Sequence, residues 1–229
     1  MSERVRIDHP YGEIDVAYAT SLATRAPDDD GPAYMVNLMR YKPVAEYADG
    51  RESTLTGKEA DDEYAPTEVL ADIGAVVVLF GDVIDQTRGE TAWDRVGIVR
   101  YPTRRSFVEM QQRRDFADKH AHKAAGMERT IVAVCLPPAD EAERLDARLR
   151  SDEPLVLHLV RHGDAPAPVD PGHLALRVEG TVIGDGTPWD EVRFARGAHD
   201  APAAADAHSV VIRPTIDRLA VTAPAGADG

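Results

Sequence analysis

Two stretches of similar sequence decide the fold of this chain: Met35-Val36-Asn37-Leu38-Met39-Arg40 and Val156-Leu157-His158-Leu159-Val160-Arg161. Each stretch is apolar except at its third and sixth residues, a pattern that predicts a compact, largely buried strand. The pairing matches Asn37 with His158 and Arg40 with Arg161. Internal similarity of this kind predicts that one structural unit occurs twice.

The tryptophans mark the same repeat. They open two similar segments, Trp93-Asp94-Arg95-Val96 and Trp189-Asp190-Glu191-Val192. A Gly-x-Val-Ile segment precedes each of them, at Gly81 and at Gly180. The two tryptophans are 96 residues apart and the two glycines 99. We therefore expect the turn of the second hairpin to be three residues shorter.

The first half of the chain alternates strands and helices. Strands are expected at 34–41, 75–84, 93–101 and 130–136, and helices at 56–73 and 104–127. This βαββαβ order is typical of a ferredoxin-like sheet with both helices on one face. The bare face needs a second sheet, which the second half can supply. The predicted fold class is α+β, with two tandem ferredoxin-like βαββαβ units forming a pseudo-dimeric α+β barrel.

The second unit is expected to be reduced. Its first two strands are separated by His162–His173, whose three prolines exclude a helix, so this unit lacks its first helix. Its second helix is expected only at about 203–212. The predicted boundaries are an N-terminal extension with one short amphipathic helix at 1–33, the first unit at 34–138, a linker at 139–153, the second unit at 154–222 and a disordered tail at 223–229.

Charge and composition argue against several classes of partner and location. The formal net charge of −14 argues against binding to nucleic acid or to an anionic membrane surface. The charged N-terminus leads into no apolar segment, and the longest apolar run, Ala75–Phe80, is too short to span a bilayer, so we expect a cytoplasmic protein. The single cysteine, Cys135, lies in an apolar run and is expected to be a buried thiol. Exposed sheet edges at 130–136 and 215–221 would allow a homodimer.

The first unit is similar to a known family. The resemblance rests on Val36-Asn37-Leu38-x-Arg40, Gly57-Lys58-Glu59-Ala60 with Tyr64, Trp93-Asp94, Tyr101-Pro102-Thr103-Arg104 and His122–Glu128. Over residues 34–136 the chain resembles domain-of-unknown-function family 1330 of the dimeric α+β barrel superfamily. It departs from the family in having Thr103 where serine is usual, and in carrying the second unit in the same chain. The resemblance implies the barrel fold. It implies no single reaction, because the superfamily includes cofactor-free monooxygenases, isomerases, cyclases and haem proteins.

Polar residues among apolar ones are the candidates for chemistry. Asn37 and His158 are each expected to make either a core hydrogen bond or a ligand contact, and His158 could act as a general base. Asp94, the other candidate base, shares a strand face with Arg100, and the two could pair with each other or orient an anionic or enolic substrate. Tyr64, on the first helix, either packs or supplies a phenol as acid or donor.

The predicted catalytic residues are thus His158, Asp94 and Tyr64, and the predicted substrate-binding residues are Asn37, Arg40, Trp93, Arg100 and His122. We expect no metal site, because His120 and His122 would lie about 200° apart on a helix. The chain also lacks a phosphate-binding loop, a nucleophile elbow and paired cysteines. We therefore predict a cofactor-independent enzyme acting on a small organic molecule, of isomerase, cyclase or monooxygenase type. The alternatives are a non-catalytic small-molecule-binding or accessory protein and a haem-dependent enzyme.

Overall fold

The computed structural model describes residues 6–64, 66–138, 154–163, 169, 173–196 and 204–219. Its strands are β1 (Arg6–His9), β2 (Gly12–Asp15), β3 (Ala33–Tyr41), β4 (Val76–Arg88), β5 (Arg95–Tyr101), β6 (Met127–Cys135), β7 (Leu155–Arg161), β8 (Leu174–Gly184), β9 (Glu191–Arg196) and β10 (Asp206–Asp217). Its helices are α1 (Val16–Thr24), α2 (Gly57–Tyr64), α3 (Thr67–Asp72), α4 (Arg104–Gln111) and α5 (Arg114–Gly126), with a short 3-10 turn at Pro27–Asp29. The predicted linker and tail lie outside the described residues.

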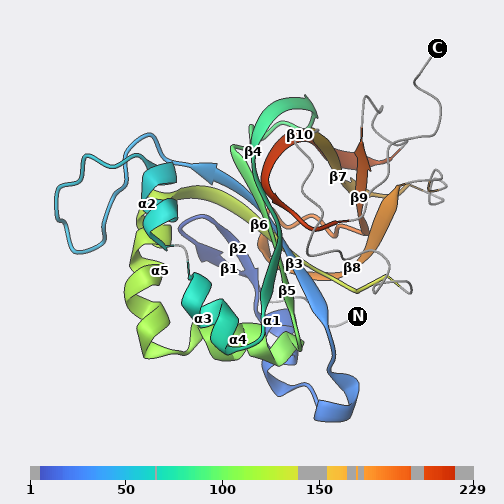
Figure 1. Cartoon of the computed structure of the whole chain (residues 1–229), viewed down its shortest axis with the longest axis horizontal. Coiled ribbons are helices and arrows are strands. Elements are labelled where there is room, and N and C mark those ends of the chain that lie inside the picture. The colour runs from blue at the N-terminus through green and yellow to red at the C-terminus, as the bar shows by residue number, and fades with distance from the viewer. Residues whose placement is uncertain are drawn as a thin grey trace.

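Eight of these strands close into an antiparallel barrel. The order is β8-β6-β3-β5-β4-β10-β7-β9, and a pairing of β9 with β8 completes the circle. The hairpin β1–β2 adds to the side of β8 outside the barrel. Figure 1 shows the barrel with α2, α3, α4 and α5 gathered on one side of it. The predicted α+β class is therefore correct at the level of a closed barrel with few helices.

Each half of the chain contributes four neighbouring strands to the barrel. The first half contributes β6-β3-β5-β4 and the second contributes β10-β7-β9-β8. Numbered within its own half, each sheet has the order fourth, first, third, second. The halves meet where β4 pairs with β10 and where β6 pairs with β8.

Side chains cap the first turns of two helices in the first half. Thr56 and Glu59 form a capping box at the start of α2, in which the carboxylate of Glu59 accepts from the Thr56 N–H at 2.7 Å. Thr103 caps α4 by accepting from the Ser106 N–H. The helices are nevertheless shorter than predicted. The expected helix at 56–73 is divided between α2 and α3, with Pro66 before α3, and the one at 104–127 is divided between α4 and α5.

The prediction of a helix at 203–212 was wrong, because residues 206–212 belong to β10 and the described residues before them are not helical. Its run of β-branched residues, Val210, Val211 and Ile212, favours a strand, and β10 is paired on both sides, with β4 and β7. The expected exposed edge at 130–136 was wrong, because the strand there is β6, which pairs with both β3 and β8. At the other expected edge, 215–221, β10 pairs with β4 as far as Asp217, whereas its pairing with β7 ends at Ile212.

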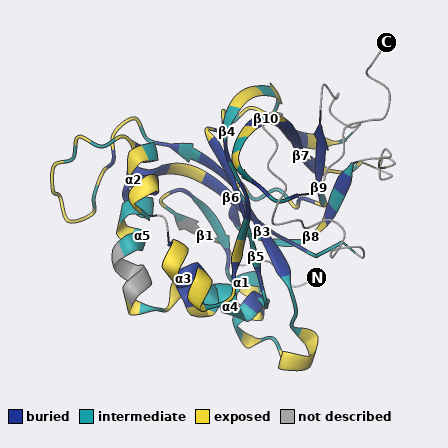
Figure 2. Cartoon of the chain, viewed as in Figure 1, coloured by how far each residue is buried: buried dark blue, intermediate teal, exposed yellow. Residues whose placement is uncertain are grey.

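Most buried residues belong to two large clusters, and Figure 2 colours long stretches of the barrel strands as buried. The barrel interior holds both tryptophans and the thiol of Cys135, which is buried as predicted. A second cluster, including Met35, Tyr101 and Met110, lies between the outer face of the first half and its helices. No helix among the described residues is long and apolar enough to cross a membrane.

Candidate functional site

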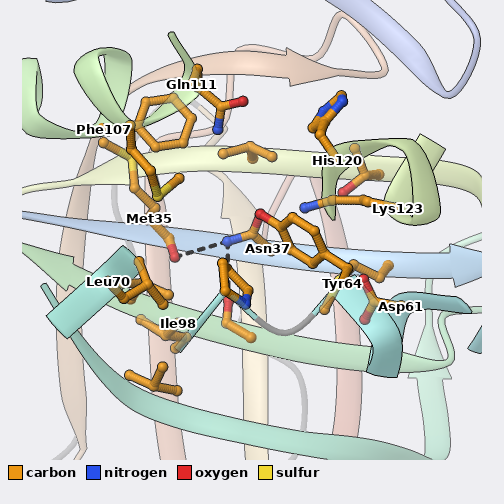
Figure 3. Close-up of a pocket in the computed structure, with 18 of the residues that line it drawn as sticks. Met35, Asn37, Asp61, Tyr64, Leu70, Ile98, Phe107, Gln111, His120 and Lys123 are labelled. Atoms are coloured by element: carbon orange, nitrogen blue, oxygen red, sulfur yellow. Dashed lines mark hydrogen bonds between the residues drawn. The ribbon is translucent and has the colours of Figure 1, made fainter. Parts of the chain in front are cut away.

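A cavity of about 480 Å³ lies between the helices and the outer face of the first half. In the first half its lining comes from β3 to β6, from α2 to α5, and from the N-terminal hairpin (Figure 3). Val182, Ile183 and Ile216 are the lining residues that come from the described part of the second half. This volume is within the range of pockets that hold small organic ligands.

The cavity has an apolar region and a polar region. Figure 3 shows Met35, Leu70 and Phe107 on one side and a group of polar side chains on the other. The polar residues that line the cavity toward this second side are Asn37, Asp61, Tyr64, His120 and Lys123. A molecule that fits both regions would have an apolar body and a polar head.

Asn37 stands on β3 with its amide held against the sheet. Its Nδ2 donates to the carbonyl oxygens of Met35 at 3.1 Å and Gly97 at 3.3 Å. These two bonds identify which amide atom is the nitrogen, because a carbonyl oxygen cannot donate. The Oδ1 atom accepts no hydrogen bond within the described residues, which leaves it available to a donor in the cavity.

Tyr64 closes α2 beside Asn37 (Figure 3). Burial raises the pKa of the Tyr64 phenol well above its usual value, and its electrostatic interactions with Tyr101, Asp61 and Tyr11 raise it further. The phenol therefore stays protonated and can donate at any pH near neutrality. Asn37 and Tyr64 are thus the two predicted site residues that the structure brings together in the cavity.

Lys123 lies on α5 with its Nζ atom 5.2 Å from the centroid of the Tyr64 ring. It forms no ion pair with a carboxylate of the described residues. Burial lowers the pKa of its ammonium group, and the carboxylate of Asp61 opposes that change. The side chain is half-buried, which is costly for a permanent charge.

His120 lies one helical turn before Lys123 on the same face of α5. Its Nε2 atom is 3.3 Å from the hydroxyl of Tyr11, a residue of the β1–β2 turn. Burial lowers the pKa of His120, and the charges of Lys123 and His9 lower it further. The imidazole is therefore neutral near pH 7 and can accept a proton.

A cluster of charged side chains around Arg95 lies next to the polar region of the cavity and includes Asp61, which lines it. The buried guanidinium of Arg95 donates to Asp61 at 3.3 Å, to Asp62 at 2.7 Å and to Asp82 at 3.1 Å. Asp61 also accepts from the Tyr41 hydroxyl at 2.6 Å. This network fixes the end of α2, and with it Tyr64, relative to β5.

The remaining predicted site residues do not line the cavity. Asp94 is exposed and accepts from the Tyr41 N–H at 2.8 Å, so its carboxylate fixes the end of β3. Arg40 pairs with Glu128 at the surface, and Arg100 lies on β5 outside the cavity. Trp93 lies in the barrel interior.

Both histidines singled out by the sequence also lie elsewhere. His122 accepts from or donates to the Tyr47 hydroxyl at 2.8 Å, outside the cavity lining. His158 is buried on β7, in the second half, with its Nδ1 atom 2.9 Å from Ser209 Oγ. Sequence reasoning instead missed His120 and Lys123. Their i, i+3 spacing on a helix was the available signal.

Comparisons with known proteins give a short list. No protein-family model and no curated protein matches the chain. The methylated RPA0582 protein, a solved structure, is 31% identical with a TM-score of 0.49, and the match covers 56% of this chain and 97% of that one. A structure of RPA0582, described as a protein of unknown function from Rhodopseudomonas palustris, is 26% identical with a TM-score of 0.48, covering 57% and 98%. Neither description names a ligand or a reaction.

Proposed function

We propose that this protein is a cofactor-independent enzyme that acts on a small, mainly apolar organic molecule in the helix-side cavity. The observation that carries the proposal is that a neutral imidazole, His120, and a protonated phenol, Tyr64, both line the polar side of a cavity whose other side is apolar. Groups whose environments separate their pKa values in this way are suited to acid–base chemistry.

The reaction class that fits is proton transfer at a carbon next to a carbonyl group, as in an isomerisation or a cyclisation. His120 would accept the proton from carbon, and Tyr64 would donate a hydrogen bond to the oxygen on which negative charge develops. The Oδ1 atom of Asn37 would accept from a hydroxyl of the same molecule. The apolar region would hold the body of the substrate and exclude water.

Hydrogen–deuterium exchange tests this proposal without knowledge of the natural substrate. A panel of apolar ketones, with 2-tetralone as the first probe, is incubated with the protein in deuterated buffer, and exchange of the α-hydrogens is followed by NMR. We expect catalysed exchange that falls about a hundredfold or more in His120→Gln. His122→Gln is the matched control, because it changes a histidine of the same helix outside the cavity. Equal rates in both variants would refute the assignment of the base.

A non-catalytic binding protein is the second candidate. It is favoured by the small part that the second half plays in the cavity, where its described residues supply only apolar contacts. Binding of panel compounds, seen by native mass spectrometry, together with no exchange above the rate in buffer would support this candidate over the enzyme.

We also propose that the two halves are copies of one βαββαβ unit, as the first unit's resemblance to family 1330 implies. Equivalent hydrogen bonds support this proposal. The Asp94 N–H donates to Met39 O and its carboxylate accepts from the N–H two residues further on, at Tyr41. Asp190 does the same with Val160 O and the N–H of His162.

The register corrects one detail of the predicted repeat. Gly81 pairs with Val96, and the residue that pairs with the equivalent Val192 is Leu176 rather than Gly180. The match of Gly81 with Gly180 was therefore wrong, and with it the expected shortening of the turn. The described residues of the second half contain no helix, which fits a copy that has kept its strands and lost its helical layer.

A further inference from the structure

The chain has four lysines, Lys42, Lys58, Lys119 and Lys123, and of these Lys123 is the one that lines the cavity. Lys42 pairs with Glu46 at 2.8 Å, and Lys58 pairs with Asp82 at 2.6 Å. Lys123 forms no such pair within the described residues and turns instead into the cavity, beside the face of Tyr64 (Figure 3). An amine placed there meets any polar head that enters the cavity.

We infer that Lys123 is an imine-forming lysine, which condenses with the carbonyl group of an aldehyde or ketone held in the cavity. This inference deepens the proposed function and rests on it, because it concerns the same cavity and the same class of substrate. The Nζ lone pair would attack the carbonyl carbon, the C=O bond would become a hydroxyl, and loss of that hydroxyl as water would leave the C=N bond. No oxidant, reductant or cofactor is needed, since one amine and one carbonyl give one imine and one water.

The surroundings of Lys123 supply what these steps require. An amine must be unprotonated to attack, and burial favours the neutral form of Lys123, whose ammonium forms no ion pair with a carboxylate of the described residues. The titratable groups that face it are Tyr64, Asp61 and His120. The neutral imidazole of His120 can take up the proton that the nitrogen loses and pass it to the departing hydroxyl, to which the Tyr64 phenol donates a hydrogen bond, so that His120 is neutral again once water has left.

An imine would also explain why the base and the lysine share one face of α5. Once a protonated imine has formed, its positive nitrogen withdraws electrons from the neighbouring carbon, whose hydrogen becomes easier to remove. His120, three residues before Lys123, is placed to remove it. The two residues would then act in sequence on one substrate.

Reductive trapping tests the inference. The protein is incubated with benzaldehyde and sodium cyanoborohydride, and the site of the benzyl group is found by peptide mass mapping. We expect labelling of Lys123 to exceed that of Lys119 by about tenfold or more, because the cavity holds the aldehyde next to the Lys123 amine. Lys119→Arg, a change on the same helix outside the cavity, is expected to label like the wild type.

Lys123→Arg keeps the charge and is expected to lose the label, with circular dichroism confirming that it folds. Labelling that follows exposure, or that persists in Lys123→Arg, would overturn the inference. Non-covalent binding of benzaldehyde in native mass spectrometry without preferential labelling of Lys123 would overturn it too, while leaving the proposed function intact. Failure of every ketone and aldehyde of the panel to bind would instead count against the proposed function itself.

Discussion

Replacing Gly126 by alanine is a sharp test of how the cavity is built, because two simple expectations for it have opposite signs. Gly126 is the last residue of α5, where alanine is the better helix former by up to about 1 kcal/mol. Packing predicts the reverse. A Cβ atom at this position would lie 2.3 Å from the backbone oxygen of Gly57 and 3.0 Å from its Cα, where α2 crosses α5.

The size of the expected loss of stability follows from the rigidity of the Gly57 backbone. The atoms that the new methyl group meets belong to the backbone of Gly57, which is itself fixed by a 3.0 Å bond from its N–H to Lys42 O. Overpacking against an unyielding neighbour costs about 3 kcal/mol, the upper part of the usual range. Less the gain in helix propensity, a net loss of about 2 kcal/mol remains, which lowers Tm by roughly 4–8 °C in a chain of this size.

Thermal unfolding followed by circular dichroism measures this effect, with Gly31→Ala as the matched control. A Cβ atom at Gly31 would have no neighbour within 4 Å, so we expect that variant to stay within about 0.5 kcal/mol of the wild type. Separating α2 from α5 also moves Tyr64 away from Lys123, so ligand binding is expected to weaken along with stability. An unchanged or raised Tm in Gly126→Ala would refute the close crossing of these helices and the packing argument built on it.

Three further predictions concern single groups. Asp61→Asn removes a carboxylate from the buried guanidinium of Arg95 and should cost about 1.5–3 kcal/mol in urea unfolding, whereas Asp62→Asn, at a far more exposed position, should cost less. The folded state lowers the pKa of His120, so its contribution to stability is present above the unfolded value near 6.5 and is lost as pH falls through the lowered folded value. The stability of His120→Gln should accordingly vary less between about pH 7 and pH 5 than that of the wild type, and an equal slope in both proteins would contradict this. Burial raises the pKa of the Cys135 thiol, which should therefore resist iodoacetamide in the folded protein and react on unfolding; rapid labelling under native conditions would show that the barrel interior is open.

Strand prediction succeeded because the signal for each strand is local. The runs around Asn37 and Ala133 are apolar and β-branched enough to indicate buried strands without knowledge of their neighbours. The helix predicted at 203–212 failed because it was expected from the βαββαβ order of the repeat, while the pairing that makes β10 a strand comes from β4 and β7, far away in the sequence. Local propensity decided the first case and tertiary pairing decided the second.

Of the predicted site residues, Asn37 on a strand and Tyr64 on a helix line the cavity, and the others do not. Asn37 and His158 were expected on equivalent faces, yet in the structure helices cover the face of β3 that carries Asn37 and build the cavity there. Lys123 was missed for a different reason. On one continuous helix from 104 to 127 it would lie about 160° around the axis from Phe107, so the two could not share a cavity. The break between α4 and α5 resets the helical phase, and both residues line it.

The N-terminal segment also shows that a part of the chain distant in sequence helps to build the cavity. Set apart from the barrel as an extension, it proves to form one wall of the cavity, because β2 pairs with β8 and the backbone oxygen of Tyr11 accepts from the Thr130 N–H at 2.9 Å. The hydroxyl of Tyr11 reaches the Nε2 atom of His120 at 3.3 Å, so the position of the proposed base depends on a hairpin more than a hundred residues earlier. A base oriented by a distant element needs that element in place, and the chemistry proposed for this cavity therefore depends on the N-terminal hairpin and on β8, which pairs with it, as well as on α5.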